Sequence, residues 1–335
     1  MQAYQIGSRF GIDQLELSDR ETPTPGPGEV LLRMKAASLN FRDLWIVEGE
    51  RDVPLPLIPL SDGVGEVVEV GAHVSDVKAG DRVAPIFAQD WIAGAHPQMD
   101  QLLTLGGPLD GVLTQYGVWP AANVVKLPAY LSHEEAACLP CAAVSAWNAL
   151  FVSAQIKPGD TVLIQGTGGV SLFGLKFAKL AGAEVVLLSS SDEKLDRAKA
   201  LGADHLINYR STPQWGKEVR RTLGRGVDCV LEIGGAGTLE QSLEAVRNGG
   251  QISFVGVVAG KTKDLYIEPV GYKSVRLQGI RVGNRQSFES MLRAMALHRV
   301  HPIIDKVFRF DEAADALRYL KQGGHFGKIC IDIGA

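Results

Sequence analysis

DTVLIQGTGGVSLFGLKFAKLAG, residues 160–182, is the stretch that decides the fold. Its first part, 160–165, is a compact apolar run suited to a strand that is buried on both faces. A glycine-rich turn follows, and then Phe173, Phe177 and Leu180 recur at the spacing of one helical stripe. Gly182 ends that helix, since glycine is common just beyond a helix C-terminus. The stretch therefore predicts a buried strand, a tight turn and an amphipathic helix.

The alternation of strand and helix continues through the middle of the chain. Residues 184–189 have the pattern of a second buried strand, and Ser190-x-x-Glu193 is a capping-box pattern that opens the next helix. Two further rounds are predicted, with strands at 227–233 and 251–256, a helix around 239–246 and a last segment at 275–280. Alternating units of this length indicate an α/β fold with a doubly wound parallel sheet.

The first third of the chain has a different pattern. Residues 29–39 and 63–71 have the composition and alternation of strands, and Gly and Pro residues separate them, which suggests a small β-barrel or sandwich. Residues 85–120 show no clear period and are predicted to be loop with short elements. The tail is predicted to form helices at 288–298 and 311–321 and a strand at 328–333 that can return to the first domain.

Composition limits the classes of function. The chain has 335 residues, enough for two domains, and 46% of them are hydrophobic, which excludes disorder for the chain as a whole. Thirty-four Lys and Arg against 38 Asp and Glu give a net charge of −4, so we expect no nucleic-acid partner. The few scattered cysteines indicate a reducing compartment. Because no signal peptide or long apolar span is apparent, we expect a cytoplasmic protein without a membrane partner.

The glycine-rich turn is the strongest single functional signal. Glycine allows a sharp turn and close approach to a pyrophosphate, and the N–H groups at the start of the following helix favour its negative charge. Ser171 stands where the usual fingerprint has its last glycine, and it is small enough for close helix–strand packing. We therefore predict that a dinucleotide binds at Gly166, Thr167, Gly168, Gly169 and Val170.

The end of the second strand distinguishes NADPH from NADH. An NAD enzyme usually has Asp or Glu there to bind the ribose 2′-hydroxyl, and that carboxylate would repel a 2′-phosphate. Here Ser189, Ser190 and Ser191 end the strand, no acid occurs until Asp192, and Lys194 can supply a positive charge. We expect NADPH in preference to NADH. The serines could instead only cap the helix, and both roles are compatible.

Several motifs occur in order along the whole chain. They are Ala36-Ala-Ser-Leu-Asn-Phe-Arg-Asp43, Gly63-x-Gly65 with Val67-Val-Glu-Val-Gly71, Lys78-x-Gly-Asp-Arg-Val83, the Gly166 turn, Ala200-Leu-Gly-Ala-Asp204 and Gly323-Gly-His-Phe-Gly-Lys328. Together they resemble the medium-chain dehydrogenase/reductase superfamily. The resemblance implies a GroES-like catalytic domain made of residues 1–143 and 283–335, with a Rossmann domain at 144–282 inserted into it and an active site in the cleft between them. It also implies a homodimer or homotetramer through the sheet edge near 275–282, and a small-molecule substrate.

The chain departs from this pattern at the metal. Where the zinc alcohol dehydrogenases of the superfamily hold a catalytic zinc with Cys, His and Cys, the matching residues here are Asn40, Ser61 and Cys141, and amide and hydroxyl groups are poor zinc ligands. The region of their structural zinc lobe, 88–113, has no cysteine, and Cys138 and Cys141 are expected to be buried structural residues. We expect no zinc, as in the zinc-independent quinone oxidoreductases and enoyl reductases.

That branch implies reduction of a quinone or an activated C=C bond with NADPH. Hydride transfer to an unsaturated carbonyl leaves charge on oxygen, which hydrogen-bond donors must stabilise if no metal does. Asn40 is the first candidate and Ser61 and Arg42 are weaker ones, while Arg42 with Asp43 could equally be an ion pair that holds the loop. Asp62 could relay a proton, although an exposed turn carboxylate is the more common fate.

The resemblance also assigns cofactor contacts outside the glycine turn. Lys328 matches a basic position near the pyrophosphate, Val255 and Val282 match backbone positions beside the nicotinamide, and Tyr209 joins the cofactor set. Two alternatives stay open at this point. One is an alcohol dehydrogenase that recruits a metal through Cys141, and the other is an NADPH-binding sensor without turnover.

Overall fold

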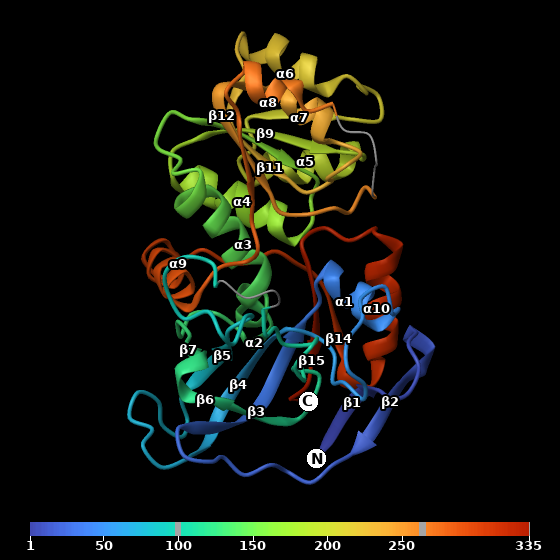
Figure 1. Ribbon diagram of the computed structural model, residues 1–335, viewed down its shortest axis with the longest axis vertical. Helices are drawn as coiled ribbons and strands as arrows, with labels where there is room; N and C mark the ends of the chain where they lie inside the picture. Colours follow the sequence, from blue (N-terminus) through green and yellow to red (C-terminus); the bar gives the residue numbers. More distant parts are fainter. Residues whose placement is uncertain (98–101, 261–265, 335) are drawn as a thin grey trace. The chain divides into compact units, whose positions relative to one another are not determined.

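The computed structural model describes residues 1–97, 102–260 and 266–334 (Figure 1). Within them the chain forms two compact units. Unit 1 consists of residues 1–144 and 283–335, and unit 2 consists of residues 145–282. A short helix, α3 (Val144–Trp147), lies where the chain passes from the first unit into the second.

Unit 2 is built on a parallel sheet. Its described residues contribute six strands in the order β10-β9-β8-β11-β12-β13, and every neighbouring pair is parallel. All five residues of β8 are buried, which explains their continuous apolar character, since helices cover both faces of such a sheet. The strands are β8 (Thr161–Gln165), β9 (Glu184–Ser189), β10 (His205–Asn208), β11 (Val227–Glu232), β12 (Val246–Phe254) and β13 (Arg276–Gly279). The predicted α/β class and doubly wound sheet are confirmed.

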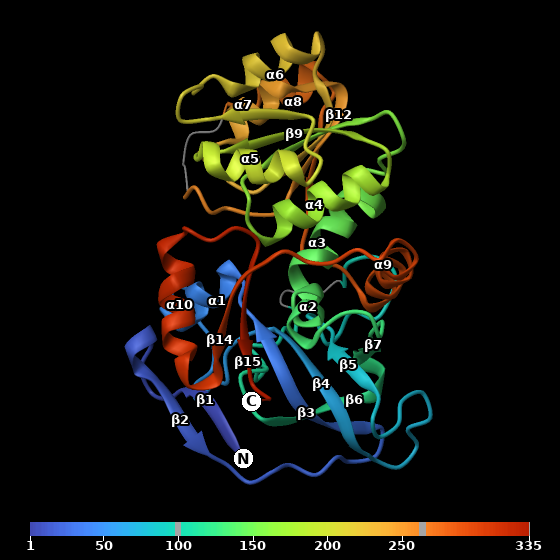
Figure 2. The same cartoon turned by 180° about the vertical axis from the view of Figure 1, so that it is seen from behind.

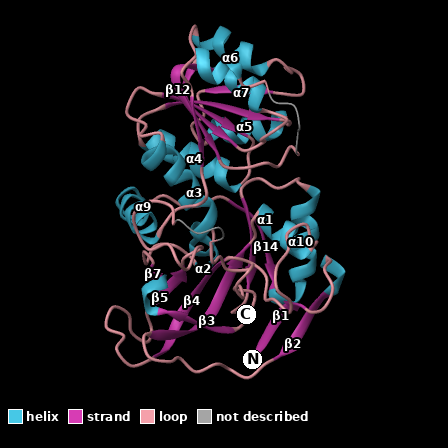
Figure 3. Ribbon diagram, in the orientation of Figure 1, coloured by secondary structure: helices cyan, strands magenta, loops and turns pink. Residues whose placement is uncertain are grey.

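The helices of unit 2 lie on both faces of this sheet, with α4 and α5 on one face and α6 and α7 on the other (Figure 3). The predicted start of α5 was displaced by one residue. Its N-cap is Ser191, whose hydroxyl accepts a hydrogen bond from the backbone N–H of Lys194, so Ser190 precedes the cap. The helices are α4 (Gly169–Leu180), α5 (Asp192–Ala200), α6 (Trp215–Leu223), α7 (Leu239–Ala245) and α8 (Glu268–Tyr272).

Unit 1 is mainly antiparallel. Its described residues form one sheet in the order β14-β15-β3-β4-β5-β7, with β6 paired to β3, and a separate pair of strands, β1 and β2. Leu32, Met34 and Val67 are among the buried side chains of its core. The strands are β1 (Gln2–Ile6), β2 (Leu15–Asp19), β3 (Glu29–Ser38), β4 (Asp62–Val70), β5 (Arg82–Pro85), β6 (Tyr116–Pro120), β7 (Val124–Lys126), β14 (Ile304–Arg309) and β15 (Lys328–Asp332). The helices are α1 (Phe41–Val47), α2 (His133–Ala137), α9 (Arg285–His298) and α10 (Ala313–Gln322).

The two ends of the chain meet in unit 1. Strand β15 pairs antiparallel with β3, with Cys330 opposite Ser38, and Figure 2 shows β15 between β3 and β14. The predicted return of the last strand to the first domain is therefore correct. Residues 85–120 contain the strand β6, which the irregular sequence did not reveal.

The expected assembly edge is β13, which has one neighbour, β12, in the described sheet and whose four residues are all exposed. A homodimer or homotetramer through this edge stays a prediction. Among the described residues, no helix is both long enough and apolar enough to cross a membrane.

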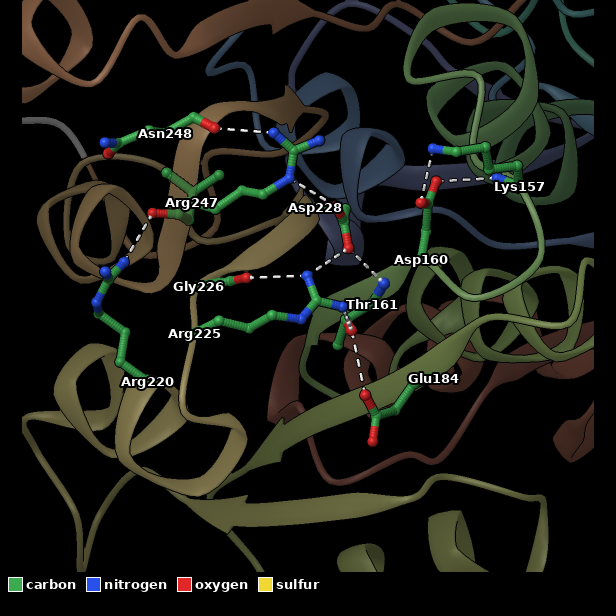
Figure 4. Close-up of polar contacts among 11 residues, drawn as sticks. Lys157, Asp160, Thr161, Glu184, Arg220, Arg225, Gly226, Asp228, Arg247 and Asn248 are labelled. Carbon is green, nitrogen blue, oxygen red and sulfur yellow. Dashed lines mark hydrogen bonds and ion pairs between the residues drawn. The ribbon is translucent and has the colours of Figure 1, made fainter.

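An ionic cluster connects the N-terminal ends of β8 and β11 (Figure 4). The glycine-rich turn lies at the opposite, C-terminal end of β8. Asp228 accepts hydrogen bonds from the backbone N–H of Thr161 at 2.8 Å, from Arg225 at 3.0 Å and from Arg247 at 2.6 Å. Burial alone would raise the pKa of Asp228, but these donors outweigh it and the pKa is lowered. The carboxylate therefore stabilises the fold in its charged form.

We expect Asp228→Asn to lower the free energy of unfolding by about 1–3 kcal/mol at neutral pH, because the amide cannot accept all three hydrogen bonds and places its own donor against theirs. A carboxylate with a lowered pKa stabilises the folded state above the unfolded-state value of about 4, and this stabilisation is lost as the pH falls through the folded-state pKa. Thermal unfolding of the wild type and of Asp228→Asn, from neutral pH down to acidic pH, measures the difference in stability between them.

The matched control for this prediction is Asp196→Asn, which removes the same charge from an exposed position on α5. Equal unfolding temperatures for the two variants at neutral pH would show that the cluster around Asp228 contributes no stability.

Candidate functional site

The glycine-rich turn of unit 2 joins β8 to α4. Gly166 has φ +75°, a left-handed conformation that favours glycine, and a side chain added at Gly168 would meet no atom within 4 Å. The hydroxyl of Ser171 donates to the carbonyl of Gln165 at 2.7 Å and so closes the turn on itself. The open space above Gly168 and the N-terminus of the long helix α4 fit a pyrophosphate. Thr167 and Val170 complete this loop as predicted, with Thr167 buried.

A buried polar network connects the glycine-rich turn to the loop that follows β11. The side-chain carbonyl of Gln165 accepts from the backbone N–H groups of Ile233 and Gly234, both at 3.0 Å, and its amide nitrogen donates to Glu232 at 2.7 Å. Glu232 is fully buried and also accepts from the backbone of Gly235 and from two hydroxyl groups, those of Thr238 and Ser242. Sequence reasoning missed Gln165 and Glu232, although both are polar residues that end otherwise apolar strands.

The predicted 2′-phosphate residues lie at the ends of β9 and β10. The backbone N–H of Tyr209 donates to the carbonyl of Ser189 at 3.0 Å, which places Tyr209 beside the serines. Asp192 is the first acid after the strand, and its carboxylate accepts from the side chain of Asn208 at 2.7 Å. Ser191 caps α5, and Lys194 lies in the first turn of that helix. The structure thus brings together Ser189, Ser190, Ser191, Lys194 and Tyr209.

The two predicted nicotinamide positions lie beyond β12 and β13. The backbone N–H of Val255 donates to the carbonyl of Glu232 at 2.9 Å. Val282 has φ +54°, which is strained for a β-branched residue, and its carbonyl accepts from the side chain of Asn148 at 2.7 Å. Strained backbone that is held by a specific partner is typical of functional sites.

In unit 1, sheet register brings three distant segments together. Ser38 of β3 pairs with Asp62 of β4 on one side and with Cys330 of β15 on the other. Both pairings are antiparallel. Asn40, two residues after Ser38, therefore lies opposite Lys328, two residues before Cys330, and close to Ser61, the residue before Asp62. The Asn40 side chain donates to the Ser61 hydroxyl at 3.4 Å, and the Lys328 ammonium donates to the Asn40 side-chain carbonyl at 2.7 Å.

The chain of hydrogen bonds ends at Asp62. The Ser61 hydroxyl donates to one oxygen of Asp62 at 2.8 Å, and the backbone N–H of Cys141 donates to the other at 2.9 Å. Asp62 is fully buried, so the expectation of an exposed turn carboxylate was wrong. Burial raises the pKa of Asp62, and the charge of Lys328 and the hydrogen bond from Ser61 oppose that rise.

Arg42 and Asp43 support the loop that carries Asn40. The Arg42 guanidinium donates to the carbonyls of Leu105 and Gly107, both at 3.0 Å, and lies over the ring of Phe87. Asp43 accepts from the backbone N–H of Asn40 at 2.7 Å. Burial raises the pKa of Asp43 to about 6, against the charge of Arg42. The guanidinium of Arg42 also lies 3.5 Å from the carboxylate of Asp43, and these contacts favour the ion-pair role over a catalytic role for both residues.

Lys328 contacts the segment that carries Asn40. Its ammonium is 3% exposed and donates to the carbonyls of Leu39, at 2.5 Å, and of Asn40. The pyrophosphate role stays a prediction, and the contacts place Lys328 with the catalytic candidates of unit 1.

The donor set around Asn40 does not fit zinc. It offers an amide, a hydroxyl, the Asp62 carboxylate, whose two oxygens already accept from Ser61 and from the backbone of Cys141, and the thiol of Cys141, whose pKa is raised by burial and by the nearby charge of Asp62. Among residues 1–97, 102–260 and 266–334, no group of three or more His, Cys, Asp or Glu side chains is arranged to hold a metal ion. Cys138 is buried against Cys330, with 3.5 Å between the sulfur atoms, and its thiol also donates to the backbone carbonyl of Glu134 at 3.1 Å.

Comparisons with known proteins agree with this architecture. Residues 26–129 match the alcohol dehydrogenase GroES-like domain, and residues 169–297 match the zinc-binding dehydrogenase family. A zinc-type alcohol dehydrogenase-like protein of Schizosaccharomyces pombe is 44% identical over 333 residues, with 96% of each chain covered.

Solved structures agree as well. An NAD-dependent alcohol dehydrogenase superposes with a TM-score of 0.93 at 34% identity and covers 100% of each chain. The crotonyl-CoA carboxylase/reductase AntE in complex with NADP superposes with a TM-score of 0.91 at 25% identity, over 100% of this chain and 95% of that one. The chain therefore belongs to the zinc-type alcohol dehydrogenase-like proteins of the medium-chain dehydrogenase/reductase superfamily and is an NAD(P)H-dependent oxidoreductase.

Proposed function

We propose that the protein reduces a small activated alkene, an enone or enal, or a quinone, with NADPH and without a catalytic zinc. One observation carries the proposal: where zinc-dependent relatives are expected to hold a metal, this chain has a polarised row of hydrogen bonds from Lys328 through Asn40 and Ser61 to Asp62. The bound nicotinamide supplies the hydride. The residues of the chain orient the acceptor and stabilise the charge that forms on its oxygen.

Asn40 is the proposed donor to that oxygen. Its side-chain nitrogen has two N–H groups, and the contact with Ser61, at 3.4 Å, is long for a hydrogen bond. The Asn40 side chain also lowers the pKa of Asp62 by hydrogen bonding, so an oxygen acceptor would compete with Ser61 and Asp62 for this donor. The exposed ring of Phe41, which packs edge-on against Trp45 beside Asn40, offers an apolar surface to a flat acceptor.

The preference for NADPH rests on the charge at the ends of β9 and β10. Hydroxyl groups of Ser189, Ser190 and Ser191 can donate to a phosphate, and the carboxylate of Asp192 is already engaged with Asn208. The crotonyl-CoA reductase that superposes on this chain was solved with NADP. The NAD-dependent alcohol dehydrogenase supports the alternative cofactor.

Chelation tests the metal-free part of the proposal. Protein dialysed against a chelator until zinc is below stoichiometric amounts is expected to oxidise NADPH with an ortho-quinone or an enone at an unchanged rate. A second candidate, an alcohol dehydrogenase that uses a metal through Cys141, is favoured by the name of the 44% identical relative. Loss of activity on chelation and its return with zinc would establish that candidate and contradict ours.

Asn40→Ala is expected to lower kcat about 100-fold, because one preorganised donor to a developing oxyanion contributes about 3 kcal/mol. KM for NADPH should stay unchanged, because Asn40 belongs to unit 1 and not to the glycine-rich turn. Steady-state kinetics with a quinone acceptor measures both constants. Asn40→Asp controls for side-chain size, because aspartate has nearly the same shape as asparagine but no N–H₂ group. Its kcat should be as low as that of Asn40→Ala. Wild-type kcat in either variant would contradict the role of this amide.

Ser190→Asp is expected to raise KM for NADPH at least about tenfold and to leave KM for NADH unchanged or lower, because a carboxylate there repels a 2′-phosphate. Ser190 precedes the N-cap of α5, so the substitution leaves the cap intact. Ser190→Asn is the neutral control. Equal changes for NADPH and NADH, or equal effects of Asp and Asn, would mean that Ser190 does not face the ribose.

A further inference from the structure

Lys328 is a charged residue with an unusual position. Its side chain is buried within unit 1, and charged groups are rarely buried unless they are paired. The ammonium donates to the backbone carbonyl of Leu39 at 2.5 Å and to the side-chain carbonyl of Asn40 at 2.7 Å. Both partners belong to the segment that joins β3 to α1. Lys328 therefore acts on the backbone and on the side chain of the same short segment.

The ammonium group of Lys328 fixes the orientation of the Asn40 amide. Lysine has only donors, whereas the amide of asparagine has an acceptor at one end and donors at the other. With Lys328 in place, the carbonyl end of the Asn40 amide must face the ammonium, because the reversed amide would put two donors against each other. The N–H₂ end then faces Ser61, as the distance of 3.4 Å from the Asn40 nitrogen to the Ser61 hydroxyl indicates.

The contacts of Ser61 and Asp62 support the same orientation of the Asn40 amide. The Ser61 hydroxyl donates to Asp62, so its oxygen is available as an acceptor toward Asn40. Asp62 is fixed in turn by the backbone N–H of Cys141. A neutral residue at position 328 would keep the hydrogen bonds of Ser61 and Cys141 to Asp62, but it would remove the ammonium that orders the amide and the positive charge that opposes the rise in the pKa of Asp62.

We infer that Lys328 is a positioning residue, which holds the Asn40 amide with its N–H₂ group directed away from β15 as a permanent donor to the substrate oxygen. The inference rests on the proposed function, in which Asn40 is that donor. It differs from the pyrophosphate role that the family resemblance implies for Lys328, since a positioning residue acts on the rate of the reaction and a pyrophosphate ligand acts on cofactor binding.

A double-mutant cycle separates these roles. The variants are Lys328→Met, Asn40→Ala and the double variant, assayed with an ortho-quinone at varied NADPH. We expect Lys328→Met to lower kcat about tenfold, or about 1.4 kcal/mol, with KM for NADPH changed less than about twofold. In the Asn40→Ala background the same substitution should cost less than about twofold, because Lys328 acts through Asn40. Lys328→Arg, which also has only donors, should lose less rate than Lys328→Met.

Different results would contradict the positioning role of Lys328 and the proposed function on which it rests. If Asn40→Ala has the wild-type kcat, the proposed function is wrong. If Asn40→Ala is slow but Lys328→Met costs the same factor in both backgrounds, only the positioning role is wrong. A large rise in KM for NADPH with unchanged kcat would assign Lys328 to the pyrophosphate instead.

Folding is checked by thermal unfolding and by fluorescence titration with NADPH for every variant. If Lys328→Met does not fold, Lys328→Gln takes its place in the cycle, because its neutral amide can still donate to Leu39 while it can present either end to Asn40. Additivity in that cycle would overturn the inference, and a coupling of at least about fivefold would support it.

Discussion

The pairing of β3 with a strand on each side is the constraint on which the site in unit 1 depends. Ser38 is held between Asp62 and Cys330, which are 24 and 292 residues away in the chain (62 − 38 and 330 − 38). A shift of one residue in either pairing would turn Lys328 or Asp62 to the opposite face of the sheet, because side chains alternate along a strand. The contacts of Asn40 with Ser61 and with Lys328 follow from this register, and so does the burial of both charges.

Buried charges at the two ends of the row have an energetic cost. Lys328 and Asp62 lose the hydration that stabilises an ion, and hydrogen bonds within the protein, together with the attraction between the two charges, offset part of that loss. The partners that do so are backbone groups of Leu39 and Cys141 together with the side chains of Asn40 and Ser61. An apolar core of the same shape would avoid this cost. We interpret the retained charges as the means by which the protein keeps a neutral amide in one orientation, as a metal-free site for charge on oxygen requires.

The sequence predicted most of the sheet of unit 2 because those strands and helices are local patterns, whereas the short strand β10 and the helix α6 were not predicted. The apolar run of β8, the stripe of α4 and the stop at Gly182 need no information from elsewhere in the chain. Single-residue errors arose where two local signals competed, as at Ser190 and Ser191, either of which can cap a helix. The strands β1, β2 and β14 were not predicted, since each contains residues that are exposed or only partly buried, which weakens the alternation of apolar and polar residues.

The site was predicted less completely than the fold. Asn40 and Ser61 could be found from the residues at positions that match the metal ligands of relatives, and the structure places them in contact. The burial of Asp62 and the partners of Lys328 could not be found in this way, because they depend on the register of β15 against β3. The link between Gln165 and Glu232, which are 67 residues apart, likewise depends on the adjacency of β8 and β11 in the sheet.

The most direct measurement is a crystal structure with NADPH and an unreactive enone analogue, with diffraction data also collected at the zinc absorption edge. We predict that the side-chain nitrogen of Asn40 lies within about 3 Å of the carbonyl oxygen of the analogue and that no anomalous peak occurs beside Cys141. A zinc peak bound to the Cys141 sulfur, with the Asn40 amide directed away from the ligand, would contradict the proposed chemistry.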